Sequence, residues 1–318
     1  MRRRDLTLIA LVCVVLAAGL TGTNATLVGK PRMADRLLMH NQVLANQAYA
    51  PYETDSFLVA HLIQWLSELT GVSLGGLFNR TWGLAYLFAL GGCAYWFWAL
   101  FRAPGRVVVG LLSVALYAGL MLQFSFHHTQ DPFAAGLFAL CLGLMVQGKL
   151  PALLLASLAA GFLWDKHVLL GPVLFAFLAW QGQWRRGLLW AVFVTLAAAV
   201  GPAVYRLALG PHDMTPAGYL TAVGGLLHTL PITAGTHLVL LGLPLLGAFA
   251  ARGKVPPALW CAALVYPAMI VVYLALGLFL FEARSFWIVV PAFAAFTALL
   301  VEDTRTERVT SAPVGRSA

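Results

Sequence analysis

The chain has 318 residues, of which 61% are hydrophobic and only 10% are charged. About a quarter of the residues of a soluble domain are charged, so this composition excludes an ordinary soluble enzyme. Stretches of about 20 apolar residues, the length that crosses a bilayer, recur along the chain and leave no room for a soluble catalytic domain. The net charge of +8 does not indicate nucleic-acid binding, because basic residues of membrane proteins gather in cytoplasmic loops.

The N-terminal sequence MRRRDLTLIALVCVVLAAGLTG combines a basic start with an apolar run from Leu6 to about Gly22. This pattern fits either a signal peptide that is cleaved near Ala25 or an uncleaved first helix, and we favour the uncleaved helix. With either alternative, the residues that follow are expected on the outer side of the membrane.

Further apolar segments predict helices at about 74–101, 105–126, 130–147, 151–164, 168–182, 187–207, 236–252, 256–281 and 285–301. Together with the first segment they predict an all-α polytopic membrane protein with about ten hydrophobic helices. We expect a single transmembrane domain over residues 1–301 and a short cytoplasmic tail over residues 302–318.

The basic residues alternate with these segments as the positive-inside rule requires. If the N-terminus is cytoplasmic, every short inner loop carries Lys or Arg: FRAPGR (101–106), QGKLP (147–151), QGQWRRG (181–187) and ARGKVPP (251–257). Of the 12 acidic residues, only Asp5, Glu302, Asp303 and Glu307 are then inside. We therefore expect an inner-membrane protein with both termini in the cytoplasm and its chemistry on the outer face.

The first outer connection is too long for a passive linker, and it contains two amphipathic patterns. Residues 33–48 interleave Leu and Val with polar residues, and residues 56–69 place Leu58, Leu62, Trp65 and Leu69 at helical spacing. Both segments are expected to be interfacial helices that lie along the membrane surface. The turn YAPYETD (49–55) separates them, because Pro51 breaks the helix.

The stretch GFLWDKHVLLGP (161–172) places Asp165, Lys166 and His167 within a very apolar region. A helix over residues 151–164 is only about 21 Å long, shorter than the hydrocarbon core of about 30 Å. We therefore expect the three residues at a turn that dips below the outer surface and faces a wet, protein-lined cavity. The alternative is a helix-end turn whose charges reach the lipid headgroups.

Two other outer connections carry candidate ligand-binding groups. SFHHTQDPF (125–133) brings His127, His128 and Asp131 together, and Asp131 also suits the N-cap of the next helix. The adjacent histidines are not at a chelating spacing on a helix, so a metal is not indicated. In FEARSF (281–286), Arg284 suits a phosphate or carboxylate partner, and the alternative is an internal ion pair with Glu282.

The carboxylates of the first outer connection are candidate general bases. Glu53 and Asp55 lie in the turn between the two amphipathic segments, and Asp35 opens the first of them. A carboxylate in a cleft beside lipid can act as a base. The alternative is helix capping, for which Thr54, Asp55 and Ser56 are all suited.

Four features of the chain carry a resemblance to a known family. The first is the long outer loop with its two interfacial helices and acidic residues. The second is QDPFAAGLFALCLGLMVQGKLPALLLASLAAGFLWDKHVLLGPVLFAF, in which an outer Asp opens a helix and a later short helix ends in an outer charged turn. The others are APYETDSFLVAHLIQWLSELTGVSLGGLFNRTWGLAYLFAL and FEARSFWIVVP. In these features the chain resembles the GT-C superfamily, polytopic glycosyltransferases that take sugars from polyprenyl-phosphate carriers at the outer membrane face.

The resemblance implies roles for the candidate residues. It implies that Glu53 or Asp55, or else Asp35, is the base that deprotonates the acceptor. Lys166, Arg206 and Arg284 are then expected to contact phosphate, and Glu282, Asp165, His167, His127, His128 and Asp131 to complete the substrate site. The expected partners are a lipid-linked sugar donor and membrane lipids, with no cofactor required although a divalent metal can serve in the family.

The chain departs from the family pattern in two ways. The acidic residues do not form the tight pair that many members carry directly after the first helix, and the chain has no C-terminal soluble domain. The alternatives are a transporter or flippase, and a non-catalytic subunit of an envelope assembly complex.

Overall fold

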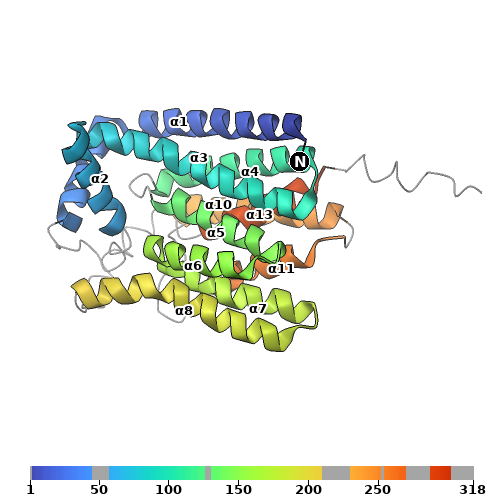
Figure 1. Cartoon of the computed structure of the whole chain (residues 1–318). Helices are drawn as coiled ribbons and strands as arrows, with labels where there is room; N and C mark the ends of the chain where they lie inside the picture. Colours follow the sequence, from blue (N-terminus) through green and yellow to red (C-terminus); the bar gives the residue numbers. More distant parts are fainter. Residues whose placement is uncertain are drawn as a thin grey trace, which may run out of the picture.

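The computed structural model describes residues 2–44, 57–125, 130–209, 230–251, 254–269 and 287–301. These residues form a bundle of helices with no strand among them (Figure 1). In chain order the elements are α1 (Arg3–Leu44), α2 (Phe57–Thr70), α3 (Leu74–Phe101), α4 (Pro104–Ser125), α5 (Gln130–Val146), α6 (Leu150–Leu163), the 3₁₀ turn η2 (Asp165–Leu169), α7 (Leu170–Trp180), α8 (Trp184–Leu209), α10 (Leu230–Ala250), α11 (Pro257–Ala263) and α13 (Val290–Ala298). The prediction of an all-α fold is confirmed for this part of the chain.

Three of these helices are long and apolar enough to cross a membrane: Arg3–Thr26, Leu74–Phe101 and Trp184–Tyr205. The further apolar helical stretches are shorter, with 10–17 residues each. Several helices expose large apolar side chains along their outer faces, among them Leu84, Leu155, Leu196 and Phe249. Such a surface is costly in water and suits lipid. The prediction of about ten spans remains a prediction.

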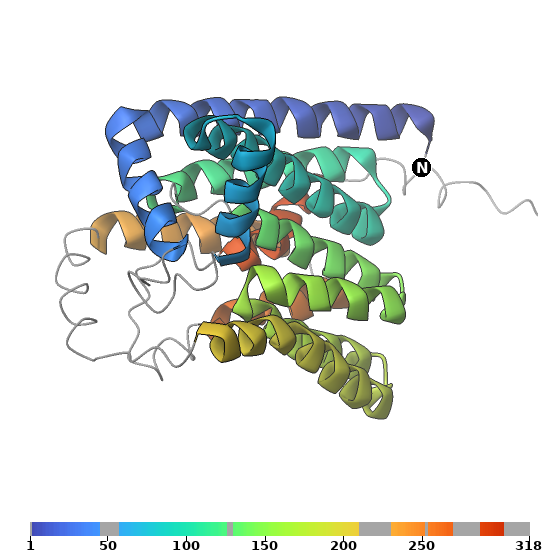
Figure 2. The same cartoon turned by 60° about the vertical axis from the view of Figure 1, so that its left-hand side comes forward.

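The helix α1 is longer than its sequence predicts. We expected the first helix to end near Gly22 and a separate helix to begin at Met33, but one helix runs from Arg3 to Leu44. The intervening threonines do not break it, because their hydroxyls donate to carbonyls four residues back: Thr21 to Ala17, Thr23 to Gly19 and Thr26 to Gly22. Figure 2 shows that α1 changes direction and that its second part crosses one end of the bundle. Pro31 lies within this helix, and proline is a usual cause of a helix bend.

The helix α2 confirms the predicted helix over residues 56–69, and it has three distinct faces. Ile63 is 1% exposed and packs with Leu77 and Phe78 at the start of α3. Leu62, Trp65 and Leu69, three of the predicted apolar positions, face outward and are exposed. A third, polar face carries Gln64, whose side-chain amide donates to the Glu68 carboxylate at 2.7 Å. A helix with one buried, one exposed apolar and one polar face suits a membrane–water interface.

Successive helices run in alternating directions, so their ends gather at two opposite ends of the bundle (Figure 1). The N-terminus lies at one of them, which we call the basic end because it carries Arg102, Arg106, Lys149, Arg185, Arg186 and Lys254 at helix termini. The other, which we call the α2 end, carries Arg80, Asp131, Lys166 and His167. Between these ends, α3 to α8 contain no Asp, Glu, Lys, Arg or His, whereas α10 contains His237, eight residues into the helix.

Glycines allow the closest helix contacts. At the crossing of α3 and α5, a Cβ on Gly92 would meet the backbone of Gly136, and a Cβ on Gly136 would meet the backbone of α3. Lipid-embedded helices associate through such close contacts, because apolar burial gives no advantage there. Gly92 and Gly136 therefore set the distance between α3 and α5.

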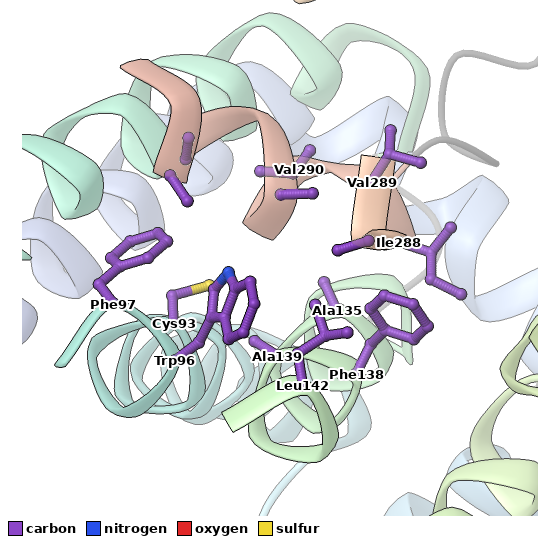
Figure 3. Close-up of a cluster of buried hydrophobic side chains, with 14 of the residues drawn as sticks. Cys93, Trp96, Phe97, Ala135, Phe138, Ala139, Leu142, Ile288, Val289 and Val290 are labelled. Atoms are coloured by element: carbon purple, nitrogen blue, oxygen red, sulfur yellow. The ribbon is translucent and has the colours of Figure 1, made fainter. Parts of the chain in front are cut away.

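The core lies around α13, whose nine residues are all buried. A helix that is apolar on every side is stable only when other helices surround it, and α13 packs against α4, α10, α11 and α5. Figure 3 shows the side chains of Cys93, Trp96 and Phe97 from α3 facing Ala135, Phe138 and Ala139 from α5 and Val290 from α13. This core holds α3 and α5 in place, and α5 in turn carries part of the candidate site.

Candidate functional site

The candidate site is the turn at which α6 ends, at the α2 end of the bundle. Trp164 follows α6 in an extended conformation, with φ −162° and ψ 133°, and the 3₁₀ turn η2 begins at the next residue. The sequence prediction of a short helix followed by a turn at WDKH is therefore confirmed. Trp164 is 4% exposed, so the turn is anchored by a buried aromatic side chain.

The crossing of α6 and α8 fixes where the turn lies. A Cβ on Gly161 would meet the Ala198 carbonyl, and a Cβ on Gly201 would meet the Gly161 carbonyl. Pro202 lies four residues after Ala198 in α8 and has no N–H to donate to that carbonyl. The close approach of Gly161 therefore places α6 against the Ala198 carbonyl, which receives no hydrogen bond from position 202 of its own helix.

Tyr205 links α8 to the last turn of α6. Its hydroxyl donates to the Phe162 carbonyl at 2.8 Å. The last carbonyls of a helix have no partner within the helix, and this bond supplies one for the Phe162 carbonyl. Tyr205 thus fixes the backbone of Phe162, two residues before Trp164.

His167 is fully buried and joins the turn to α5. Its exposed fraction is 0%. Its Nδ1 lies 3.0 Å from the Trp164 carbonyl oxygen, and its Nε2 lies 3.0 Å from the Ala134 carbonyl oxygen. The ring also lies 6.0 Å from the Phe138 ring, centroid to centroid. We expected His167 to face a wet cavity and contact substrate, but its burial between carbonyls makes it a support of the turn.

Asp131 is also buried, with an exposed fraction of 1%. It lies within the first turn of α5, which begins at Gln130, and not before the helix as its predicted N-cap. A carboxylate in the first turn is stabilised by the positive end of the helix dipole. Asp131, Ala134 and Phe138 follow one another at spacings of three and four residues and so share one face of α5. That face contacts His167 through Ala134 and Phe138.

Lys166 is the cation of this site that is partly exposed. Its Nζ lies 3.9 Å from the centroid of the Trp164 ring, the geometry of a cation–π interaction. Trp164 is itself fixed by burial, so it limits the positions that the ammonium group can adopt. Neither Trp164 nor Tyr205 is among the residues predicted from the sequence. Trp164 could have been selected because an aromatic residue lies two positions before a lysine in a turn. No sequence pattern indicates Tyr205.

From the predicted set, Asp131, Lys166 and His167 lie at the α2 end of the bundle. Asp35, Asp165 and Arg206 lie in α1, η2 and α8, and only their backbone is described. Glu53, Asp55, His127, His128, Glu282 and Arg284 lie outside the described residues. Within the described part of the chain, no group of three or more His, Cys, Asp or Glu residues could hold a metal.

The arrangement places a half-buried cation, fixed by an aromatic ring, beside a buried histidine and a buried carboxylate at one end of an apolar bundle. Such a site can bind an anionic group, because a partly buried ammonium forms charge-assisted hydrogen bonds to phosphate oxygens. Searches of the chain against protein-family models, curated proteins and solved structures find no match.

Proposed function

We propose that this protein is a membrane glycosyltransferase that transfers a sugar from a polyprenyl-phosphate-linked donor to an acceptor at the α2 end of the bundle. The observation that supports it best is Lys166, a partly exposed cation held over the Trp164 ring on a turn that α5 and α8 fix in place. A lipid phosphate needs such a cation at headgroup depth and an apolar surface for its chain. The outward-facing apolar side chains of α2 and α6 supply that surface.

The proposed orientation puts the basic end in the cytoplasm and the α2 end outside. Short loops rich in Lys and Arg stay inside, and the described loops of the basic end follow this rule. In this arrangement α2 is an interfacial helix on the outer leaflet, with Leu62, Trp65 and Leu69 toward lipid. The shorter apolar helices then complete the predicted set of about ten spans.

In the proposed reaction, Glu53 or Asp55 accepts the proton of the acceptor hydroxyl as its oxygen attacks the anomeric carbon of the sugar. The bond from that carbon to the phosphate oxygen breaks, and polyprenyl phosphate leaves with the electron pair. Lys166, together with Arg206 and Arg284, stabilises the negative charge that grows on the leaving phosphate. These assignments follow the resemblance to the GT-C superfamily.

A transporter is the main alternative from another class. Transporters of ions or protons place ionisable residues and broken helices near the middle of the membrane. In the helices α3 to α8, the ionisable residues instead lie near the helix ends. This distribution favours chemistry at one membrane face.

We expect the two ends of the bundle to react differently with a membrane-impermeant maleimide on intact cells. The native cysteines Cys13, Cys93, Cys141 and Cys261 are buried, so the unmodified protein gives a low background. Glu68 and Lys149 are exposed at the α2 end and the basic end, respectively. Glu68→Cys should be labelled on intact cells, and Lys149→Cys only after the cells are permeabilised. The reverse pattern would contradict the proposed orientation.

We expect the purified protein to turn over a polyprenyl-phosphate-linked sugar, and Glu53→Gln or Asp55→Asn to abolish most of that turnover. The assay is run with several sugars, with and without a chelator, and Arg284→Ala is included as a phosphate-contact variant. Turnover that survives all three substitutions would contradict the assigned residues. No binding of any such donor would favour a structural subunit of an envelope complex.

A further inference from the structure

The hydrogen bonds of His167 determine its charge. Each ring nitrogen lies 3.0 Å from a backbone carbonyl oxygen, of Trp164 at Nδ1 and of Ala134 at Nε2. A carbonyl oxygen can only accept a hydrogen bond, so both bonds require a hydrogen on both nitrogens. A neutral imidazole has only one such hydrogen and would direct a lone pair at one of the two carbonyls. Both contacts are therefore favourable only for the imidazolium cation.

We infer that His167 is a cationic positioning residue, which fastens the turn η2 to α5 as an imidazolium with Asp131 as its counter-charge and thereby fixes Lys166. Its effect on Lys166 rests on the proposed function, in which Lys166 contacts phosphate, whereas the charge state of His167 does not. His167 is not proposed to touch the substrate, because it is fully buried.

A buried cation needs a negative partner, because removing a charge from water is costly. Asp131 shares with Ala134 and Phe138 the face of α5 that meets the His167 ring, and it is 1% exposed. The helices α6 and α7, which also pack against η2, contain no ionisable residue. The remaining described ionisable groups, either nearby in sequence or in the last turns of α8, are Asp165, Lys166, Tyr205 and Arg206, whereas Arg185 and Arg186 begin α8 at the basic end. Among these groups, Asp131 is the acid on the face of α5 that contacts the ring through Ala134 and Phe138.

Loss of the proton would weaken the turn. Above the pH at which His167 titrates, the ring can keep only one of its two bonds, and the other carbonyl faces a lone pair. The turn would then be held to α5 or to Trp164, but not to both. Because Lys166 directly precedes His167, its ammonium group would no longer have one fixed position over the Trp164 ring. Phosphate binding at this site should therefore decline as the pH rises through this titration.

The charge state can be measured directly by NMR of the full-length protein labelled with ¹⁵N-histidine in micelles. The His167 signals are assigned by their absence in His167→Gln. We expect His167 to remain doubly protonated at about pH 8, well above the ordinary histidine pKa of about 6.5. Asp131→Asn should lower the midpoint of the His167 titration by about one pH unit or more. A neutral His167 at that pH, or a midpoint that Asp131→Asn does not move, would overturn the inference.

The positioning role is tested by the binding of a synthetic polyprenyl phosphate as a function of pH. In the wild-type protein, affinity should fall at least fivefold across the His167 titration, and in Asp131→Asn the same fall should occur at lower pH. An affinity that does not change across this titration would overturn the positioning role while leaving the charge assignment intact. Absence of binding at every pH would contradict the proposed function and, with it, the positioning role, but the NMR result would still decide the charge of His167.

Discussion

Gly92→Ala is expected to destabilise the protein by about 3 kcal/mol, toward the upper end of what overpacking costs in a core. A Cβ at this position would meet the backbone oxygen and carbon of Gly136. Backbone atoms of a packed helix cannot rotate away as a side chain can, so α3 and α5 would have to separate. Unfolding by sodium dodecyl sulfate from mild detergent micelles, followed by tryptophan fluorescence, gives the free energy of unfolding.

Gly91→Ala is the matched control for this prediction. It adds the same methyl group one residue earlier on the same helix, where the new Cβ has nothing within 4 Å. Because alanine favours a helix interior over glycine, this variant should be unchanged or more stable by about 0.5–1 kcal/mol. Equal effects of the two substitutions would mean that α3 and α5 do not meet at Gly92 and Gly136.

Lys166→Gln is expected to lower kcat/KM for a polyprenyl-phosphate-linked sugar about 100-fold, the size of effect that follows the loss of one donor to a developing negative charge. Glutamine keeps most of the length and polarity of the side chain but removes its charge. It also removes the cation–π contact to Trp164, whose ring centroid lies 3.9 Å from Nζ in the native protein. Steady-state turnover in micelles measures the change.

Lys149→Gln removes the same charge at the basic end, where Lys149 is exposed before α6, and it should leave turnover unchanged. Trp164→Leu should lower turnover less than Lys166→Gln, because the ammonium remains but loses its fixed position. If Lys149→Gln and Lys166→Gln had equal effects, the lysine at the α2 end would have no special role.

Much of the helical layout could be predicted from the sequence, because apolar runs of sufficient length between polar loops have few alternatives to helices. The predicted span at 74–101 coincides with α3. The short helix before WDKH was also predictable, since a run of 14 residues cannot cross the membrane. Composition and length were sufficient for both.

The boundary of α1 could not be predicted in this way. The residues between Gly22 and Met33 include Thr, Asn, Gly, Lys and Pro, which usually end a helix. Thr23 and Thr26 remain compatible with the helix because their hydroxyls donate to its own carbonyls, those of Gly19 and Gly22. Propensity is therefore a weak guide where side chains can bond to the helix backbone.

The position of the candidate site in the chain could be predicted from the sequence, but the burial and contacts of its residues could not. The sequence indicated that Asp165, Lys166 and His167 occupy one turn, but not which of them would be buried. The burial of His167 depends on the Ala134 carbonyl, 33 residues earlier in the chain. The position of the turn likewise depends on the bond from Tyr205 to Phe162. Contacts between residues so far apart in sequence leave no local pattern.

We propose that the α2 end binds a polyprenyl phosphate through Lys166. Native mass spectrometry of the protein released from nanodiscs that contain a synthetic polyprenyl phosphate tests this most directly, because it counts bound lipid on each variant. We predict one tightly bound lipid on the wild-type protein and on Lys149→Gln, and loss of most of that bound population in Lys166→Gln. Equal retention of the lipid by Lys166→Gln, or no retained lipid on the wild-type protein, would contradict the claim.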